Sequence, residues 1–447
     1  MRAATWTEAW AAGGRAVHIG DVADFNAQFL PQSAGSRRQG HHYSCLAAFY
    51  SPHPAVLVLP HEVEEGWLRL LERELGWSAV ELHSGLAGDG LMAPALAARP
   101  ALRQRIDGLG LPVRRWGRSG PDGPAGAPDD PALAAVRRYE AKDESHALFA
   151  RIAPGHPGVR VPAQQAVEPG RRLARLVAAR AAGGRTTVLK ARHGVGGFGT
   201  ALLTPEQVTL AGGARSLLRR LTEHQVLPPG EPLLVEEYVD GGGRLRHPTF
   251  DGVVADDGSV HPVGVGLMDV EGTGYRGATV GPGLVPRGLA DTVAAFGLAV
   301  GRELARAGHR GWYDVDFVTD RTGRPAPTET NLRLTGPAVA FMLKTRLDAV
   351  RGPGHLVRTL DRLPLGARLG PQPLLAHLER LARRCAPFGA TLLPTIPTTG
   401  SEPEPTVGIA LAAAGPAAPD ALDAAEAVVR SANLALGDPF EALEPRS

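Results

Sequence analysis

The sequence predicts a mixed α/β protein made of more than one domain. Two continuous apolar runs, at 16–20 and 55–59, have the composition of parallel strands that are buried on both faces. Helical patterns near 62–75 and 93–107 alternate with these runs, which is typical of an α/β layer. A chain of 447 residues is too long for one hydrophobic core, so roughly two to four domains are expected.

Changes in composition indicate where these domains begin and end. Gly, Pro and Asp fill 117–131, and further breaks fall at 365–373 and 398–405. Near the C-terminus, two strand-like runs precede an Ala-rich helix at 419–435. We expect five segments. The first two are an N-terminal α/β domain (1–125) and a connecting helical segment that carries Lys142 (126–185). A small lid subdomain (186–240), a larger core (241–369) and a C-terminal accessory domain (370–447) follow.

A glycine-rich loop follows the predicted strand at 186–191. Gly194, Gly196 and Gly199 match G-x-G-x-x-G, but 200–203 continues as a strand, whereas the dinucleotide fingerprint requires a helix there and an acid about 20 residues on. The Gly-Lys-Ser/Thr ending of a Walker A loop is also missing. The pattern instead predicts a hairpin whose glycine N–H groups cover phosphates.

Lysine usage singles out the cation beside that loop. Of 48 basic residues, Lys142, Lys190 and Lys344 are lysines and the other 45 are arginines. Where arginine is the default cation, a retained lysine indicates a position that needs a compact ammonium charge. Lys190, on the strand directly before the loop, is therefore predicted to bind phosphate, whereas Lys344 is interpreted as a helix-surface residue.

A second hairpin is predicted over 315–331. Its first strand is apolar and β-branched around Asp316, and Asp320-Arg321-Thr322-Gly323 forms the turn. If Thr322 and Gly323 form the tip, Asp316 lies opposite Glu329, and Asn331 points the same way as Glu329. Two facing carboxylates repel each other unless a hard divalent cation such as Mg²⁺ lies between them. Asp316, Glu329 and Asn331 are therefore candidate metal ligands.

A third segment, at 232–242, is a buried apolar strand that ends in Glu236-Glu237-Tyr238-Val239-Asp240 and a glycine turn. Together the three segments, over about 135–350, resemble the ATP-grasp superfamily. The resemblance implies an ATP-grasp fold in which Glu236 lies near the adenine amino group and the Glu237–Val239 backbone follows the base edge. It also implies that Lys142 is a first phosphate lysine and Lys190 a second.

The resemblance extends to other parts of the chain. The N-terminal layer resembles the pre-ATP-grasp domain that precedes this fold. Glycines occupy the stretch where the family places a ribose-binding acid, so two alternatives stay open: Asp240 substitutes for it, or this contact is missing. The full set of ATP-binding candidates is Lys142, Lys190, Gly194, Gly196, Gly197, Gly199, Glu236, Glu237, Val239 and Asp240, with Mg²⁺ as the metal.

Composition limits the other function classes. The net charge of +2 is too balanced for a nucleic-acid surface, and Cys45 and Cys385 are too few for a disulfide framework or a Cys₄ zinc site. The N-terminus lacks a signal-peptide core, and the longest apolar run, near 407–419, is short and broken, so neither a signal peptide nor a membrane span is expected. We expect a cytoplasmic enzyme with small-molecule substrates, and self-association into a homodimer stays open.

These parts predict a reaction. Magnesium and lysines would neutralise ATP so that a carboxylate attacks the γ-phosphorus, and an amine would then convert the acyl phosphate to an amide. Arg333, two residues after Asn331, is placed to clamp the transferring group, while Arg276 and Arg310 are weaker candidates for binding the donor carboxylate.

The order of domains resembles the actinobacterial peptide ligases of the pheganomycin type. Those enzymes join a guanidino-bearing amino-acid-like acid to a peptide amine, so the resemblance implies a peptide ligase of antibiotic biosynthesis. Two other functions stay open: an ATP-grasp kinase that phosphorylates a hydroxyl, and a catalytically silent ATP-binding regulator.

Overall fold

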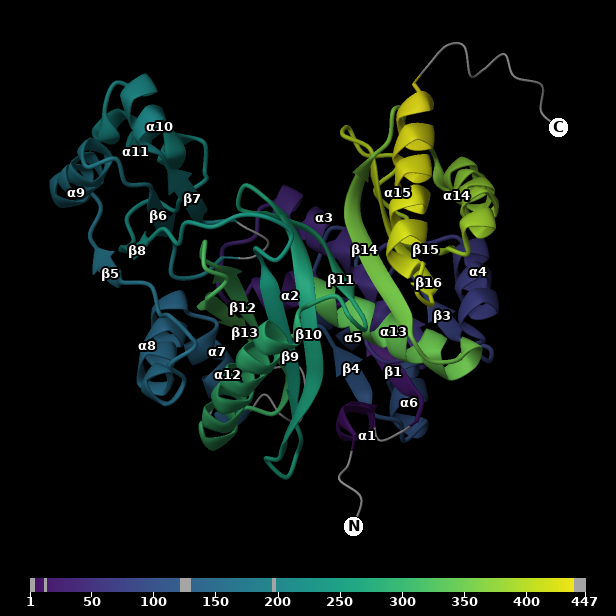
Figure 1. Ribbon diagram of the computed structural model, residues 1–447. Coiled ribbons are helices and arrows are strands. Elements are labelled where there is room, and N and C mark those ends of the chain that lie inside the picture. The colour runs from purple at the N-terminus through teal and green to yellow at the C-terminus, as the bar shows by residue number, and fades with distance from the viewer. Residues whose placement is uncertain (1–4, 12–13, 121–129, 195–197, 438–447) are drawn as a thin grey trace. The chain divides into compact units, whose positions relative to one another are not determined.

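The structure is a computed structural model that describes residues 5–11, 14–120, 130–194 and 198–437. The chain divides into two compact units. Unit 1 contains 1–124, 276–284 and 334–447, and unit 2 contains 125–275 and 285–333. The elements of both units are shown in Figure 1.

The N-terminal part of unit 1 is a parallel sheet in the order β3-β2-β1-β4. The apolar runs predicted to be buried parallel strands are β1 (Ala16–Ile19) and β2 (Pro54–Val58), and every residue in both is buried. The other strands are β3 (Glu81–His83) and β4 (Val113–Arg115). Helices α1 (Trp6–Ala11), α2 (Val22–Asn26), α3 (Ala34–Tyr43) and α4 (Glu65–Leu75) and the 3₁₀ helix η1 (Ser44–Phe49) belong to the same region.

The helical stretch predicted at 93–107 is two helices instead of one. α5 (Met92–Ala97) ends before Pro100, and α6 (Pro100–Gly108) begins with that proline. Proline lacks the N–H needed inside a helix but fits its first turn, so Pro100 separates the two elements.

The C-terminal part of unit 1 is antiparallel. The chain enters it within β11 (Gly274–Val280), which pairs with β14 (His355–Pro364), and the order continues through β16 (Thr406–Ala414) to β15 (Thr391–Ile396). α15 (Ala418–Ala435) packs along β14 and β16, as Figure 1 shows in yellow. The remaining helices are α13 (Gly336–Arg351), α14 (Pro371–Cys385) and η3 (Ala386–Phe388).

Unit 2 contains a small antiparallel sheet in the order β5-β8-β6-β7. The predicted glycine-loop hairpin is β6 (Thr187–Lys190) and β7 (Thr200–Leu203), and the predicted strand at 232–242 is β8 (Leu233–Glu237). Apolar side chains of α9 (Arg171–Ala182), α10 (Pro205–Leu210) and α11 (Ala214–Glu223) pack against this sheet. β5 (Gln164–Val167) forms the other edge.

The larger part of unit 2 is an antiparallel sheet with strands in the order β13-β12-β9-β10. These strands are β9 (Pro248–Val254), β10 (Val260–Glu271), β12 (Gly311–Thr319) and β13 (Pro325–Asn331). α12 (Arg287–Arg306) packs on β9 and β10, and α8 (Lys142–Ile152) packs on β13. α7 (Pro131–Tyr139) precedes α8, and η2 (Ala153–Gly155) follows it.

The mixed α/β class predicted from the sequence is confirmed by this arrangement. Both cysteines, Cys45 and Cys385, are buried free thiols, which agrees with the absence of a disulfide framework. Within the described ranges, no helix has the length and apolar character needed to cross a bilayer.

Candidate active site

The predicted register of the metal hairpin is confirmed at its central pair. Asp316 lies directly opposite Glu329 in the β12–β13 ladder. A bulge follows Asp316, so Phe317 faces Pro327 and the register is shifted by one residue toward the turn. Asp320 closes the turn, since its N–H donates to the carbonyl of Arg324, and its carboxylate accepts hydrogen bonds from Thr322.

Two further aspartates, which the sequence analysis missed, extend this carboxylate row. Asp314 pairs with Asn331 on one side and with Asp251 of β9 on the other. Asn331 Nδ2 donates to Asp314 Oδ1 at 2.8 Å and lies 3.4 Å from Asp316 Oδ2. The sequence held a signal for Asp314, because it precedes Asp316 by two residues and so shares its face of the strand. Asp251 has no such neighbour in the sequence, and it joins this group because β9 pairs with β12.

Burial and like charges act together on Asp316. Burial raises the pKa of its carboxyl well above the ordinary range, and neighbouring Asp314 and Glu329 raise the pKa further. Its Oδ1 is buried and has no hydrogen-bond partner among the described residues. A buried carboxylate oxygen without a donor is costly, so this position is suited to a cation.

Lys142 neutralises the opposite carboxylate of the hairpin. It is the first residue of α8, its side chain is 6% exposed, and its Nζ forms an ion pair with Glu329 Oε2. Burial alone raises the pKa of Glu329, but Lys142 and Lys190 outweigh it and hold that pKa below the ordinary value. The sequence predicted both residues for one phosphate and metal site, and the structure brings them into direct contact.

Lys190 reaches the same hairpin from the small sheet. Its Nζ lies 2.8 Å from Glu236 Oε1 and donates to the carbonyl of Thr328 at 3.2 Å. The Lys190 and Glu236 side chains are 8% and 5% exposed. Gln164 donates to the other oxygen of Glu236 at 2.7 Å. The predicted adenine-site acid and the second phosphate lysine are therefore neighbours on β8 and β6.

Arg333 is buried beside the metal candidates. Its Nη2 donates to Asn331 Oδ1 at 2.7 Å, and its Nε lies 3.7 Å from Glu140 Oε2. Glu140 also accepts from the backbone N–H of Leu332 at 2.6 Å, and burial raises the pKa of its carboxyl. Glu140 positions Arg333, and the sequence analysis missed it. In the sequence, the indication that Glu140 belongs to the site is that it precedes Lys142 by two residues.

The glycine loop follows Lys190 and joins β6 to β7. Its ends meet through Ala191, whose N–H donates to the carbonyl of Gly199 at 2.6 Å. Gly199 has a φ of 75°, and a Cβ there would lie 2.9 Å from the Ala191 Cβ. A Cβ on Gly194 would collide with the carbonyl oxygen of Phe198. Both glycines are thus required by the closed shape of the loop itself, while Gly196 and Gly197 lie outside the described residues.

The end of β8 and the residues that follow it form ion pairs within unit 2. Glu237 pairs with Arg160, and Asp240 Oδ2 lies 2.6 Å from Arg321 Nη2 in the hairpin turn. The carbonyl of Val239 accepts from Arg246. The predicted ribose-binding residue Asp240 therefore already has a cationic partner on the surface.

Of the two weaker arginine candidates, Arg310 is bonded away from the other site residues of unit 2. Arg310 donates to the carbonyls of Asp256, Ala305 and His309, so it holds the end of α12 against the β9–β10 turn. Arg276 belongs to unit 1, whereas the other candidates belong to unit 2. Its role in binding a donor carboxylate stays a prediction.

The described ranges contain no group of three or more His, Cys, Asp and Glu side chains arranged to hold a metal ion. The predicted ligand set is different in kind, with two carboxylates and the amide of Asn331. These oxygen donors suit Mg²⁺, which takes one or two protein carboxylates and completes its shell with phosphate and water. The unpartnered Oδ1 of Asp316 is the feature of this site that fits such a cation.

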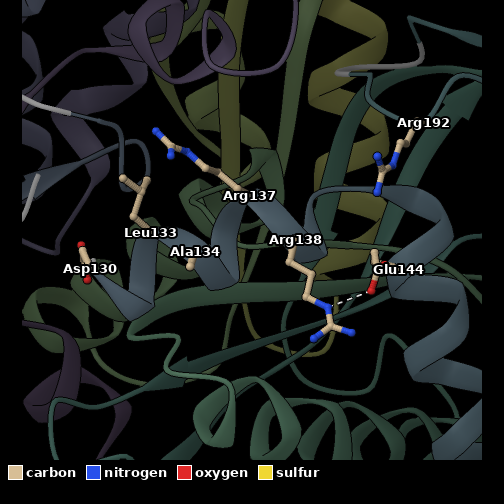
Figure 2. A pocket seen from close by; sticks show the side chains of 7 residues that line it. All are labelled: Asp130, Leu133, Ala134, Arg137, Arg138, Glu144 and Arg192. Atoms are coloured by element: carbon tan, nitrogen blue, oxygen red, sulfur yellow. Dashed lines mark hydrogen bonds and ion pairs between the residues drawn. The ribbon is translucent and has the colours of Figure 1, made fainter. Parts of the chain in front are cut away.

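A separate hollow lies at the start of α8. Its volume is about 460 Å³, and it is lined by Asp130, Leu133, Ala134, Arg137, Arg138, Glu144 and Arg192. Figure 2 shows Arg137 and Arg138 leaving α7 in different directions, with Arg138 bonded to Glu144 at 2.8 Å. Arg192 pairs instead with Asp143, and its carbonyl accepts from the N–H of Lys142. The hollow is thus next to the site without containing its predicted catalytic residues.

No protein-family model and no curated protein matches the sequence. Solved structures resemble the fold weakly. N5-carboxyaminoimidazole ribonucleotide synthetase from Thermus thermophilus is 18% identical, with 84% of this chain and 86% of that chain covered and a TM-score of 0.45. L-amino acid ligase from Bacillus licheniformis is 15% identical over 79% and 86%, with a TM-score of 0.46. Biotin carboxylase from Campylobacter jejuni is 12% identical over 85% of each chain, with a TM-score of 0.47. Similarity at this level does not assign a function.

Proposed function

We propose that this protein is an ATP-grasp enzyme that joins a carboxylic acid to an amine and releases ADP and phosphate. One observation carries the proposal. Two of the three lysines in the chain, from different elements of unit 2, meet consecutive residues of β13: Lys190 contacts the carbonyl of Thr328, and Lys142 contacts Glu329. Two buried ammonium groups beside a row of carboxylates are what a triphosphate with a divalent cation requires.

The residues of unit 2 have distinct roles in this proposal. Lys142 and Lys190 bind the negative oxygens of the triphosphate, and the backbone of the glycine loop covers them. Glu236 holds Lys190 in place from β8 and lies at the adenine end of the site. In the structure Lys142 pairs with Glu329 and Lys190 pairs with Glu236.

Asp316, Glu329 and Asn331 would hold the metal through oxygen atoms. When bound, Mg²⁺ supplies positive charge that screens the phosphates from an incoming anion. In the structure Nδ2 of Asn331 donates to Asp314 and faces Asp316, so the amide would have to turn over for its Oδ1 to join the two carboxylates as a ligand. Arg333 is the donor to that Oδ1, so the arginine is tied to the metal candidates.

The chemistry that we propose needs no covalent enzyme nucleophile. A substrate carboxylate oxygen attacks the γ-phosphorus, the bond to the ADP oxygen breaks, and an acyl phosphate forms. An amine nitrogen then attacks the acyl carbon, phosphate leaves, and the nitrogen loses a proton to give an amide. Arg333 is placed to stabilise charge on the transferring phosphoryl group, because a guanidinium donates several hydrogen bonds to phosphate oxygens.

The finer assignment follows the sequence resemblance alone. We propose an amino-acid-like donor that bears a guanidino group, and a peptide or amino-acid acceptor, as in a peptide ligase of natural-product biosynthesis. Arg276 is the proposed partner of the donor carboxylate. Arg310 is less suited to this role, because carbonyl oxygens of unit 2 already occupy its guanidinium.

The test is product analysis with Mg-ATP and a library of amino acids and short peptides. ADP release that requires both an acid and an amine, with an amide found by intact mass, supports the ligase. Without the amine, hydroxylamine should trap the acyl phosphate as a hydroxamate. AMP and pyrophosphate would indicate adenylation and contradict the mechanism, whereas ADP with a phosphorylated alcohol would indicate a kinase.

A further inference from the structure

Asp361 is a buried carboxylate in unit 1 without a cation beside it. It lies on β14 and is 4% exposed. The hydroxyl of Tyr43, the last residue of α3, donates to its Oδ2 at 2.7 Å. Among the residues that the structure describes, no Lys, Arg or His forms an ion pair with Asp361.

The other buried acids of unit 1 are compensated. Asp21 accepts from Arg115 at 3.0 Å and from the N–H of Trp116 at 2.9 Å. Asp24 accepts two backbone N–H bonds at the start of α5, from Met92 and Ala93. Removing a carboxylate from water is costly unless opposite charge or several donors replace the water. Asp361, with one tyrosine hydroxyl, has less compensation than either.

The surroundings of Tyr43 are aromatic. Its ring lies edge-on to Trp116 with centroids 5.6 Å apart, and Tyr50 lies 5.9 Å from the same indole. The Tyr50 hydroxyl is buried and has no hydrogen-bond partner among the described residues. Tyr43 reaches the Asp361 carboxylate through its hydroxyl, and its ring in turn packs on Trp116. A buried carboxylate beside aromatic side chains is suited to an organic cation.

We propose that Asp361, held by the Tyr43 hydroxyl, is the binding site for a cationic group of a substrate, either an ammonium or a guanidinium. The assignment of this cation to a substrate of the ligation rests on the proposed function, whereas the site itself does not. The ligand would supply a counter-charge that the described residues do not place beside Asp361. The alternative is a carboxyl group that stays protonated and has a structural role only.

The electrostatics of Asp361 agree with a site that awaits a cation. Burial raises the pKa of its carboxyl to about 6, and the Tyr43 hydrogen bond opposes that rise. Near neutral pH the carboxyl is therefore mostly ionised, at a position where the described part of the protein offers no positive charge. A bound cation would restore the balance.

The experiment compares ligands that differ in charge alone. Binding to the full-length protein is measured at pH 8 by calorimetry for two pairs of probes: γ-guanidinobutyrate with γ-ureidobutyrate, and δ-aminovaleramide with caproamide. In the wild type we expect at least one cation to bind about tenfold or more tightly than its neutral partner, because a buried charge pair contributes that much. In Asp361→Asn, which keeps an acceptor for Tyr43, the preference should fall to within about twofold.

Two further variants make the result decisive. Asp423→Asn removes a carboxylate of the same unit that is 61% exposed and pairs with Arg358, and it should leave the preference unchanged. Asp361→Ser is a second neutral variant, used if Asp361→Asn does not fold. The proposal is overturned if neither cation outbinds its neutral partner in the wild type, or if the preference survives loss of the carboxylate. The binding measurements do not require turnover. A failure of the cation site is therefore distinguishable from a failure of the proposed ligase activity, which is tested by ADP release.

Discussion

At the scale of single residues, the choice of lysine over arginine carries the most information. Lys190 is enclosed between Glu236 and the Thr328 carbonyl with 8% of its side chain exposed. An ammonium group fits such a position as a point charge, whereas a guanidinium is planar and larger. The contrast with Lys344 is useful, because that lysine lies on α13 and pairs with Asp348 one helical turn away, with 26% of its side chain exposed.

We predict that Lys190→Arg lowers kcat/KM for ATP by roughly tenfold or more, which corresponds to about 1.4 kcal/mol of transition-state stabilisation. Lys344→Arg is the matched control and should retain near-normal activity, because Lys344 is not among the predicted site residues and an arginine can also pair with Asp348 one turn away. Steady-state ADP release measures both. Full activity in Lys190→Arg would show that the lysine is incidental.

At the scale of elements, the hairpin of β12 and β13 shows what local sequence determines. The turn residues predicted a hairpin, and alternation along β13 placed Asn331 on the same face as Glu329. Next to the turn, however, the ladder is one residue off the predicted register, and the bulge after Asp316 restores its pairing with Glu329. Neither the turn residues nor the alternation revealed the bulge after Asp316 or the pairing of Asp314 with Asp251 on β9. The bulge depends on how the strand packs, and the second pairing joins segments more than 60 residues apart.

The same distinction holds for the contacts of the lysines. Sequence motifs indicated that Lys142 and Lys190 belong to a phosphate site, but they did not indicate which carboxylates hold them. Glu329 and Glu236 take these places because α8 packs on β13 and β6 pairs with β8, and both are contacts between distant parts of the chain. Glu140 was missed for the same reason, since its role depends on Arg333 and Leu332 being adjacent in space.

We predict that the hairpin tolerates loss of a carboxylate at its turn but not at its centre. Asp316→Asn and Glu329→Gln should each reduce turnover below detection while circular dichroism stays unchanged, because the oxygen pair loses charge at the cation. Asp320→Asn is the control, since it removes an exposed carboxylate from the same hairpin and keeps an acceptor for the turn. Near-normal activity in either central variant would remove the metal assignment.

At the scale of the whole molecule, buried acids with opposite pKa shifts make stability depend on pH. Burial raises the pKa of both Asp21 and Asp361 in unit 1 to about 6. The folded chain then binds more protons than the unfolded chain between about pH 4 and 6. These two carboxyls therefore stabilise the fold most below about pH 4, and that contribution is lost as the pH rises through about 6. Glu329 has the opposite effect on the pH dependence of stability, because its pKa is lowered in the folded chain.

The effect of one acid is isolated by comparing the wild type with Asp361→Asn. The amide cannot ionise, so the variant escapes the cost of burying a charge at high pH. We predict that the variant exceeds the wild type in free energy of unfolding at pH 8 by about 1 to 3 kcal/mol, and that the two nearly agree at about pH 4, where the carboxyl is still protonated in the folded chain. Urea unfolding at the two pH values measures the difference. Such a destabilising charge at a buried position is what a cation-binding role for Asp361 predicts. Equal stability at pH 8 would show that Asp361 is already compensated, and the inferred cation site would lose its physical basis.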